Sequence, residues 1–337
     1  MNYFITGGTG FIGTHLTNLL HEVHPEAKIY NLDIIEPGTP LPTVKNYKPA
    51  LGKGEEHAAT FIYCDVRQPI ELEKVNITPE DVIFNFAAVH RTPGHPDPAY
   101  FETNIRGAEN VCAFAERHGI RKIVFTSSIA PYGAAEELKE ETTLPMPNTP
   151  YGISKLVAEK IHQTWQAGGE GRQLTIVRPG VVFGRGENGN FTRLYWGIRG
   201  HKFMYPGRKD TIKACIYVKE LVRFMLYRLE HHDSGVELYN CCYEPAYTIE
   251  HIVESMKRVT NMKVKVPFMP GWLIMTAAGI AGALGSPMGI CPARVRKLQI
   301  STNICGKKLS ASGYRFHYTF EEALADWYKD NGNLYLQ

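Results

Sequence analysis

Residues 6–13 read TGGTGFIG, follow the short apolar run Tyr3-Phe4-Ile5 and open a segment with apolar residues at helical spacing. Glycines at this spacing allow a tight turn, close approach of the backbone to a pyrophosphate and close packing of helix on strand. The unpaired N–H groups at the start of the helix then face the phosphates. The motif predicts a dinucleotide-binding loop with cofactor contacts at Gly7, Gly10, Phe11, Ile12 and Gly13.

The acid after the second expected strand selects the cofactor. Asp33 lies 20 residues beyond Gly13, at the end of Asn31-Leu32-Asp33. A carboxylate at this place accepts hydrogen bonds from the adenosine ribose and repels a 2′-phosphate, and no Arg follows within the next several residues. We therefore expect NAD rather than NADP. The alternative interpretation is a solvated acid at the end of a strand.

Short apolar runs alternate with helical patterns through the first half of the chain. Strands are expected at 28–32, 60–64, 82–86, 122–125 and 174–177, and helices near 99–118 and 150–166. This alternation indicates parallel βαβ units, and continuous apolar strands indicate a sheet that is covered on both faces. The proline-rich segment 36–59 is expected to form a loop between the second and third strands.

After residue 180 the alternation becomes irregular. Helices are expected near 190–199, 219–230 and 248–258, with a short strand near 214–218. The sequence therefore predicts an α/β fold in which a Rossmann-type doubly wound parallel sheet is joined to a smaller mixed lobe. We assign 1–180 to NAD binding and catalysis. We assign 181–337 mainly to a substrate-binding lobe, some segments of which can return to the sheet.

Composition excludes several classes of protein. The 337 residues are 44% hydrophobic and 21% charged, and the net charge of +3 is too small for a typical nucleic-acid binder. Seven cysteines without a C-x-x-C pair argue against a disulfide framework or a zinc site, so we assign no metal. The N-terminal residues MNYFITGG lack the features of a secretory signal, and a cytoplasmic enzyme is expected.

One segment challenges that expectation. Residues 266–293 contain no charged side chain, but Pro270 and Pro287 leave about 16 residues between them, fewer than the roughly 20 that span a bilayer. Glycines within it weaken an independent helix further. We expect a buried or groove-lining helix without an integral membrane span, and peripheral contact with a membrane surface is the alternative.

Tyr151 is a candidate proton acceptor, and Lys155 is the neighbouring charge that can assist it. Their spacing of four places both side chains on one face of the expected helix, and Ser128 follows the strand before it. A Tyr acts as a base near neutral pH only when its pKa is lowered, which a nearby Lys and a cationic nicotinamide would do. The Ser128 hydroxyl can hold the substrate oxygen while the proton moves.

Together with further motifs, these residues resemble the extended short-chain dehydrogenase/reductase family, and within it the nucleotide-sugar epimerase/dehydratase branch. The resemblance covers nearly the whole chain: TGGTGFIG at 6–13, CDV at 64–66, NFAA at 85–88, TNI at 103–105, SSIAPYG at 127–133, YGISK at 151–155 and RPGVVFG at 178–184.

The resemblance implies roles for individual positions. Ser128, Tyr151 and Lys155 would form the catalytic triad, with Tyr151 and Lys155 also contacting the cofactor. It also implies a homodimer in which the helices near 99–118 and 150–166 pair across a two-fold axis. Further cofactor contacts would come from Asp65, Val66, Phe86, Ala87, Ala88, Val89, Asn104 and Pro179.

Departures from the family pattern narrow the chemistry. The acid pair with which the 4,6-dehydratases remove water is replaced by Ile129 and Ala130, which cannot transfer protons, so dehydration is not expected. Lys213 stands where the family has a diphosphate-binding Arg. Val181 replaces an Asn that contacts the diphosphate in many epimerases, and Asn190 either substitutes for it or caps a helix.

Two further positions are candidate substrate contacts. His90 follows the fourth strand, at the rim where the family admits its substrate. Arg294, after the uncharged segment, can supply a second phosphate contact. The alternative for His90 is a solvated loop residue without a function, and the alternative for Arg294 is a solvated charge on a helix.

The leading hypothesis is an NAD-dependent epimerase acting at C4 of a nucleoside-diphosphate sugar. Tyr151 would take the hydroxyl proton while hydride passes to NAD. The 4-keto sugar would then rotate within the site, and hydride would return to the opposite face of the sugar. Two other enzyme types remain. The C-terminal third is also similar to 3β-hydroxysteroid dehydrogenases, which suggests an apolar or lipid-linked alcohol near a membrane, and a 4-keto-sugar reductase is the other. A regulatory protein that has lost catalysis is disfavoured because the triad is intact.

Overall fold

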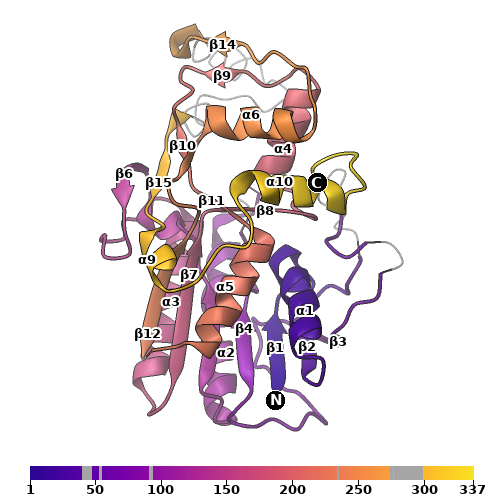
Figure 1. Cartoon of the computed structure of the whole chain (residues 1–337). Coiled ribbons are helices and arrows are strands. Elements are labelled where there is room, and N and C mark those ends of the chain that lie inside the picture. The colour runs from indigo at the N-terminus through magenta and orange to yellow at the C-terminus, as the bar shows by residue number, and fades with distance from the viewer. Residues whose placement is uncertain (40–47, 53–54, 91–93, 234, 274–275, 277–298) are drawn as a thin grey trace.

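The structure is a computed structural model that describes residues 1–39, 48–52, 55–90, 94–233, 235–273, 276 and 299–337. A large α/β unit holds the N-terminus, and a smaller lobe stands above the carboxyl ends of its strands (Figure 1). This arrangement confirms the expected fold class.

A parallel sheet of seven strands forms the centre of the large unit. Its order is β12-β7-β5-β4-β1-β2-β3, and every neighbouring pair is parallel. Six of the strands match the apolar runs in the sequence. The bounds are β1 Asn2–Thr6, β2 Lys28–Asp33, β3 Thr60–Tyr63, β4 Val82–Asn85, β5 Lys122–Thr126, β7 Gln173–Pro179 and β12 Val236–Cys241.

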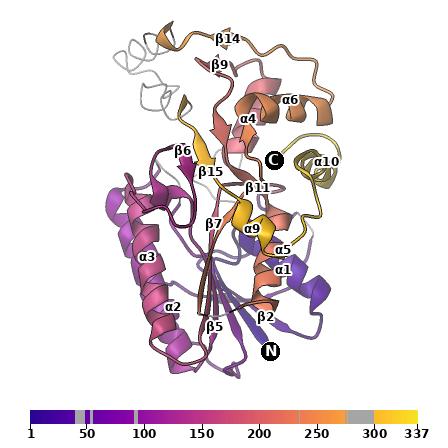
Figure 2. The same ribbon diagram turned by 60° about the vertical axis from the view of Figure 1, so that its left-hand side comes forward.

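Two layers of helices cover the sheet. Helices α1 (Phe11–Val23) and α5 (Val218–Glu230) pack together on one face, and α2 (Asp97–Arg117) and α3 (Pro150–Ala167) pack together on the other (Figure 2). Each face of the sheet therefore has its own apolar cluster, which explains why apolar residues occupy successive positions of the central strands.

The seventh strand returns from the C-terminal half of the chain. Strand β12 pairs with β7 from Val236↔Leu174 to Cys241↔Pro179 and closes one edge of the sheet. Its sequence, VELYNC, carries an acid at Glu237, which Arg228 of α5 neutralises through two bonds of 3.0 and 2.6 Å. The chain thus leaves the large unit after β7, contributes β8 (Val181–Phe183) and α4 (Asn190–Arg199), and re-enters through α5 and β12.

The smaller lobe is built on a mixed sheet and an aromatic core. Strands β13, β10, β15 and β6 form the sheet, which α4, α6 and α10 accompany. Helix α10 has a Thr319–Glu322 capping box, a signal that the sequence reasoning did not use. The remaining bounds are β6 Ala135–Lys139, β9 Tyr205–Pro206, β10 Ile212–Lys213, β11 Cys215–Tyr217, β13 Tyr247–Thr248, α6 Ile249–Val259, β14 Phe268–Met269, β15 Thr302–Ile304, α9 Lys307–Ala311 and α10 Phe320–Asp330.

The uncharged segment lies largely outside the described residues. Residues 271–273 and 276 are helical, whereas 274–275 and 277–298 are not described, so the expected helix over 270–285 stays a prediction. Within the described part of the chain, no helix is both long and apolar enough to cross a membrane.

Candidate active site

The glycine loop connects β1 to α1 at the carboxyl edge of the sheet. Gly7 has φ +70°, and a Cβ there would lie 2.7 Å from the Ala87 nitrogen. A Cβ on Gly13 would lie 2.5 Å from the Gly8 Cα, so both positions need glycine. No side chain caps α1, whose first residues are Phe11 and Ile12. The loop therefore forms a cradle that a side chain would fill, at a helix N-terminus suited to a pyrophosphate.

Asp33 ends β2 beside this loop. Its carboxylate accepts bonds from the backbone N–H groups of Thr9, Ile34 and Ile35 at 3.0, 2.7 and 3.2 Å. Partial burial raises the pKa of Asp33, and these bonds oppose the rise. Three donors leave acceptor capacity on the two oxygens, which fits a ribose with free hydroxyls. The sequence after Asp33 brings no arginine for a 2′-phosphate.

The loop after β4 forms the opposite wall of the cradle. The Phe86 N–H donates to Thr6 O at 3.0 Å, which holds the Phe86-Ala87-Ala88 segment against β1. Buried Asn104 of α2 accepts from the Val89 N–H at 2.8 Å and donates to the Val89 carbonyl at 3.1 Å. Asn104 therefore fixes the backbone of this loop.

Three of the further cofactor contacts that the resemblance implies, Asp65, Val66 and Pro179, make contacts within the protein. The Asp65 carboxylate binds the Arg67 guanidinium, with a shortest distance of 2.6 Å. Val66 is buried against Gly107 of α2, where a Cβ would lie 3.0 Å from its side chain. Pro179 is buried at the end of β7, and its carbonyl accepts from the Ile129 N–H at 3.3 Å.

Ser128, Tyr151 and Lys155 converge at the ends of β5 and α3. Burial raises the pKa of Tyr151 to about 12, and a hydrogen bond with Ser128 opposes the rise. Ser128 Oγ also accepts from the Ala130 N–H at 3.1 Å, which fixes the hydroxyl beside the phenol. Lys155 is buried with its ammonium 4.5 Å from the centre of the Phe125 ring. Burial lowers the pKa of Lys155 to about 7, against the opposing charge of Glu159.

A buried acid behind Lys155 was missed by the sequence reasoning. Glu159 lies one helical turn after Lys155 and binds Arg178 of β7 through two bonds of 2.8 and 2.6 Å. It also accepts a 2.5 Å bond from Ser127, the neighbour of Ser128. The spacing of four between Lys155 and Glu159 was a usable signal, although the partner Arg178 comes from a distant strand.

Two of the expected substrate contacts, Asn190 and Lys213, form hydrogen bonds with other residues of the protein. Asn190 is the first residue of α4 and accepts a 2.8 Å bond from Arg193, while Gly189 occupies the N-cap and Glu187 takes the helix N–H of Thr192. The alternative that Asn190 caps the helix is therefore wrong. Lys213 donates to the Ile300 carbonyl at 2.7 Å.

The structure gives less information on the remaining two candidate substrate contacts, His90 and Arg294. His90 is exposed after β4, as a rim residue would be. Arg294 lies outside the described residues, so its role stays a prediction. Among the described residues, no group of three or more His, Cys, Asp or Glu side chains gathers as metal ligands would.

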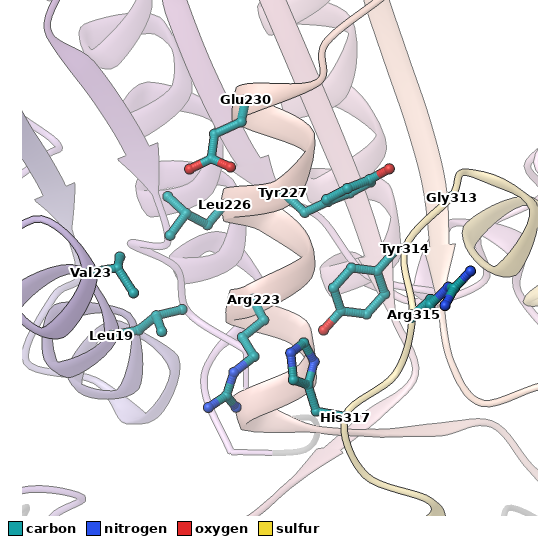
Figure 3. Close-up of a pocket in the computed structure, with 10 residues that line it drawn as sticks. All are labelled: Leu19, Val23, Arg223, Leu226, Tyr227, Glu230, Gly313, Tyr314, Arg315 and His317. Atoms are coloured by element: carbon teal, nitrogen blue, oxygen red, sulfur yellow. The ribbon is translucent and has the colours of Figure 1, made fainter.

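A separate cavity of about 480 Å³ lies on the other side of the sheet from α3. It is lined by α1, α5 and residues 313–317 (Figure 3). Two of its lining side chains form ion pairs: Glu230 with His24 at 3.8 Å and His317 with Glu220 at 3.9 Å. Because the sheet separates this cavity from Tyr151, it is not part of the candidate site.

Comparison with known proteins agrees with this geometry. The model of the NAD dependent epimerase/dehydratase family matches residues 3–242. The chain is 30% identical over 331 residues to N-acetyl-alpha-D-glucosaminyl-diphospho-ditrans,octacis-undecaprenol 4-epimerase of Escherichia coli O157:H7, covering 96% of this chain and 93% of that protein. It is 29% identical to UDP-glucose 4-epimerase of Halalkalibacterium halodurans, covering 80% and 84%.

Solved structures show the same fold at low sequence identity. The UDP-N-acetylglucosamine 4-epimerase from Methanobrevibacter ruminantium M1, in complex with UDP-N-acetylmuramic acid, superposes with a TM-score of 0.74. The match covers 98% of both chains at 21% identity. The small lobe above the carboxyl edge of the sheet is thus part of the shared architecture.

Proposed function

The chain belongs to the NAD-dependent epimerase/dehydratase family, and on this premise we propose that it is a 4-epimerase of a sugar joined to its carrier through a diphosphate. The observation that carries the proposal is the contact of Tyr151 with Ser128, one helical turn from buried Lys155. A phenol held in this way can remove and return the proton of a sugar hydroxyl.

The residues of the chain divide the work as follows. Gly7, Gly10 and Gly13 would hold the pyrophosphate of NAD, and Asp33 would hold the adenosine ribose. When bound, NAD supplies a reversible hydride acceptor, so the net reaction needs no outside reductant. Tyr151 takes the proton from the C4 hydroxyl, and Ser128 positions that oxygen. Burial raises the pKa of Tyr151 to about 12 even with the opposing Ser128 bond, so the phenol needs a nearby positive charge to act as a base, which protonated Lys155 and the nicotinamide would supply.

The same positions argue against dehydration. Elimination of water needs an acid/base pair next to Ser128, and Ile129 and Ala130 occupy these places, at the start of a 3₁₀ turn over Ala130–Tyr132. Neither side chain can carry a proton. Epimerisation requires only the single acid/base that Tyr151 provides.

A nucleoside diphosphate is the first candidate carrier. The H. halodurans relative acts on such a sugar by its name, and Lys213 offers a positive charge in the lobe. A second carrier, a polyprenyl diphosphate, is favoured by the extent of the E. coli match. That alignment spans 96% of the chain, and therefore extends across the uncharged residues 266–293, whereas the match to the UDP-glucose enzyme covers 80%.

The test uses both substrates under the same conditions. Purified protein with NAD is incubated with UDP-N-acetylglucosamine, and separately with detergent-dispersed polyprenyl diphospho-N-acetylglucosamine, and the C4 epimer is followed by NMR or chromatography. Conversion of either substrate by the native chain, and not by Tyr151→Phe, supports the proposal. Absence of conversion of both by NAD-loaded protein contradicts it.

We also propose a homodimer, supported by the outer surface of α3. Ile153 and Val157 are 39% and 36% exposed and point away from the sheet, so the sheet does not use the whole apolar stripe of this helix. Pairing of α2 and α3 with their copies would cover both side chains. Sedimentation should give twice the 37.9 kDa of one chain, and Val157→Glu should give monomers. A native monomer at micromolar concentration contradicts the dimer.

A cytoplasmic location is proposed as well. It is supported by the NAD requirement of the family, because this cofactor is a cytoplasmic metabolite, and by free thiols at six described cysteines, Cys64, Cys112, Cys215, Cys241, Cys242 and Cys305. Fractionation of cells that express the chain tests it.

A further inference from the structure

The outermost part of the small lobe is a pair of short parallel strands, β9 and β14, at the end of the molecule farthest from the N-terminus (Figure 1). The chain that leads into β14 is extended and alternates in burial. Met262, Val264 and Val266 pack against the apolar core of the lobe, and Lys263 and Lys265 between them are exposed. The alternation therefore directs two lysines outward.

Exposed apolar side chains follow the lysines along the chain. Phe268 is 52% exposed and Trp272 is 72% exposed, and Leu273 is exposed beside Trp272. A hydrogen bond closes the turn that carries Trp272: the Leu273 N–H donates to the Pro270 carbonyl at 3.0 Å. Large aromatic side chains in such positions lose favourable free energy in water unless something covers them.

The turn is also fixed against β9. A Cβ on Gly207, which has φ +84°, would lie 3.0 Å from the Gly271 Cα, so the two backbones are in close contact. The Gly207 N–H donates to the Met269 carbonyl at 2.9 Å. Trp272 is therefore held at the surface by the tertiary structure of the lobe.

The charge around these side chains is positive. Tyr205 of β9 pairs with Phe268 of β14, and the chain entering each strand carries an exposed lysine, Lys202 before β9 and Lys265 before β14. Two acids face β9 from α6, and each is neutralised: Glu250 by Lys209 and Glu254 by Lys257, both at 2.8 Å. Among the described residues, no acid forms an ion pair with Lys202, Lys263 or Lys265.

We propose that this apical surface docks on an anionic lipid bilayer. The surface consists of Lys202, Lys263, Lys265, Phe268, Trp272 and Leu273. Tryptophan prefers the membrane–water interface, where its ring is apolar and its N–H stays wet, and lysines near the surface are attracted by anionic head groups. Exposed lysines together with exposed aromatic side chains match the two kinds of contact that an anionic bilayer offers, charged head groups and an apolar interface.

Docking deepens the proposed function, on which it rests, by selecting the polyprenyl diphosphate as carrier. A sugar on a polyprenyl diphosphate stays at the membrane surface, so an enzyme that docks there meets its substrate in two dimensions. The apical surface belongs to the same lobe as Lys213, the candidate diphosphate contact.

The test is co-sedimentation of the full chain with vesicles in the absence of substrate. Phosphatidylcholine vesicles are compared with vesicles that also contain phosphatidylglycerol. We expect binding to the anionic vesicles, a blue shift of tryptophan fluorescence that Trp272→Ser abolishes, and weaker binding as salt screens the lysines. Trp165 and Trp327 are buried, whereas Trp196 is 41% exposed, so the comparison with Trp272→Ser identifies the part of the shift that comes from Trp272.

Charge variants make the test specific. Lys263→Gln/Lys265→Gln should weaken partition onto anionic vesicles roughly 30-fold, since each lysine near the surface contributes about 1 kcal/mol. The control Lys28→Gln/Lys307→Gln removes the same charge from exposed positions elsewhere and should bind as the native chain does. Thermal unfolding and NAD binding check that each variant is folded.

Three results would overturn the proposal: no binding to anionic vesicles, equal binding to neutral vesicles, or equal losses in the two lysine variants. Should the charge variant not fold, the salt dependence and Trp272→Ser decide on their own. These outcomes are independent of the proposed function. Epimerisation without vesicle binding refutes docking alone, and vesicle binding without epimerisation of either substrate refutes the function alone.

Discussion

Replacing Glu159 by Gln tests how much of the site depends on one buried ion pair. Arg178 and Glu159 are 3% and 1% exposed, and their shortest distance is 2.6 Å. Removing one partner of a buried pair leaves an uncompensated charge and costs about 3–5 kcal/mol. Because the Gln oxygen still accepts one bond, we expect a loss of about 3 kcal/mol in the free energy of unfolding.

The chain contains a matched control for this substitution. Arg185 and Glu55 have the same shortest distance, 2.6 Å, but are 29% and 44% exposed. Exposed pairs contribute about 0.2–1 kcal/mol, so Glu55→Gln should cost no more than that. The stability of both variants is measured by urea unfolding, monitored by circular dichroism and tryptophan fluorescence. The slope of the free energy of unfolding against urea concentration should be the same in the native chain and both variants.

A double variant separates the charge from the contact. Glu159→Met/Arg178→Met removes both charges and keeps apolar volume, so it should be more stable than Glu159→Gln. Equal losses for Glu159→Gln and Glu55→Gln would refute the claim that burial strengthens the pair. A double variant less stable than Glu159→Gln would refute the claim that the unpaired arginine causes the loss.

Catalysis gives a second readout of the same variant. Glu159 is the charge that opposes the burial of Lys155, whose pKa is lowered to about 7. Without it, Lys155 should lose its proton at lower pH, because one favourable charge is gone. The alkaline limb of the kcat profile should therefore shift to lower pH in Glu159→Gln and stay unchanged in Glu55→Gln. An unshifted profile would mean that Glu159 acts through stability alone.

Four further predictions use other parts of the chain. Tyr151→Phe should lower kcat by about 10²–10⁴ with NAD still bound, and near-normal turnover would place the base elsewhere. NAD should bind at least about tenfold tighter than NADP, and titration of the Asp33→Ala variant with each cofactor should show a smaller difference between the two affinities. His162 is buried and its pKa is lowered to about 4, so the unfolded state binds more protons between pH 6.5 and 4 and acid destabilises the fold by roughly 3 kcal/mol; His162→Gln should flatten that part of the urea stability profile. Lys213→Ala should raise KM for a diphosphate-linked sugar about tenfold if it contacts the phosphates, whereas an unchanged KM would restrict it to its bond with Ile300.

The sequence alone was sufficient for the large unit because its signals are local. A strand, a glycine turn and a helix follow one another within residues 2–23, and the requirement for glycine at Gly7 and Gly13 comes from contacts within the loop and with its neighbouring strand. The spacing of Tyr151 and Lys155 is likewise a property of one helix. Six of the seven sheet strands could be recognised because strands covered on both faces carry runs of apolar residues.

Only the tertiary structure decided which distant residues neutralise one another. Strand β12 carries Glu237, and its burial at the edge of the sheet depends on Arg228 from α5. Glu159 of α3 depends in the same way on Arg178 of β7, and this second pair lies beside Lys155. A charged residue in a sequence is expected in water, because burying it alone is costly. The partner that removes this cost is chosen by the packing of elements, which no local pattern in the sequence records.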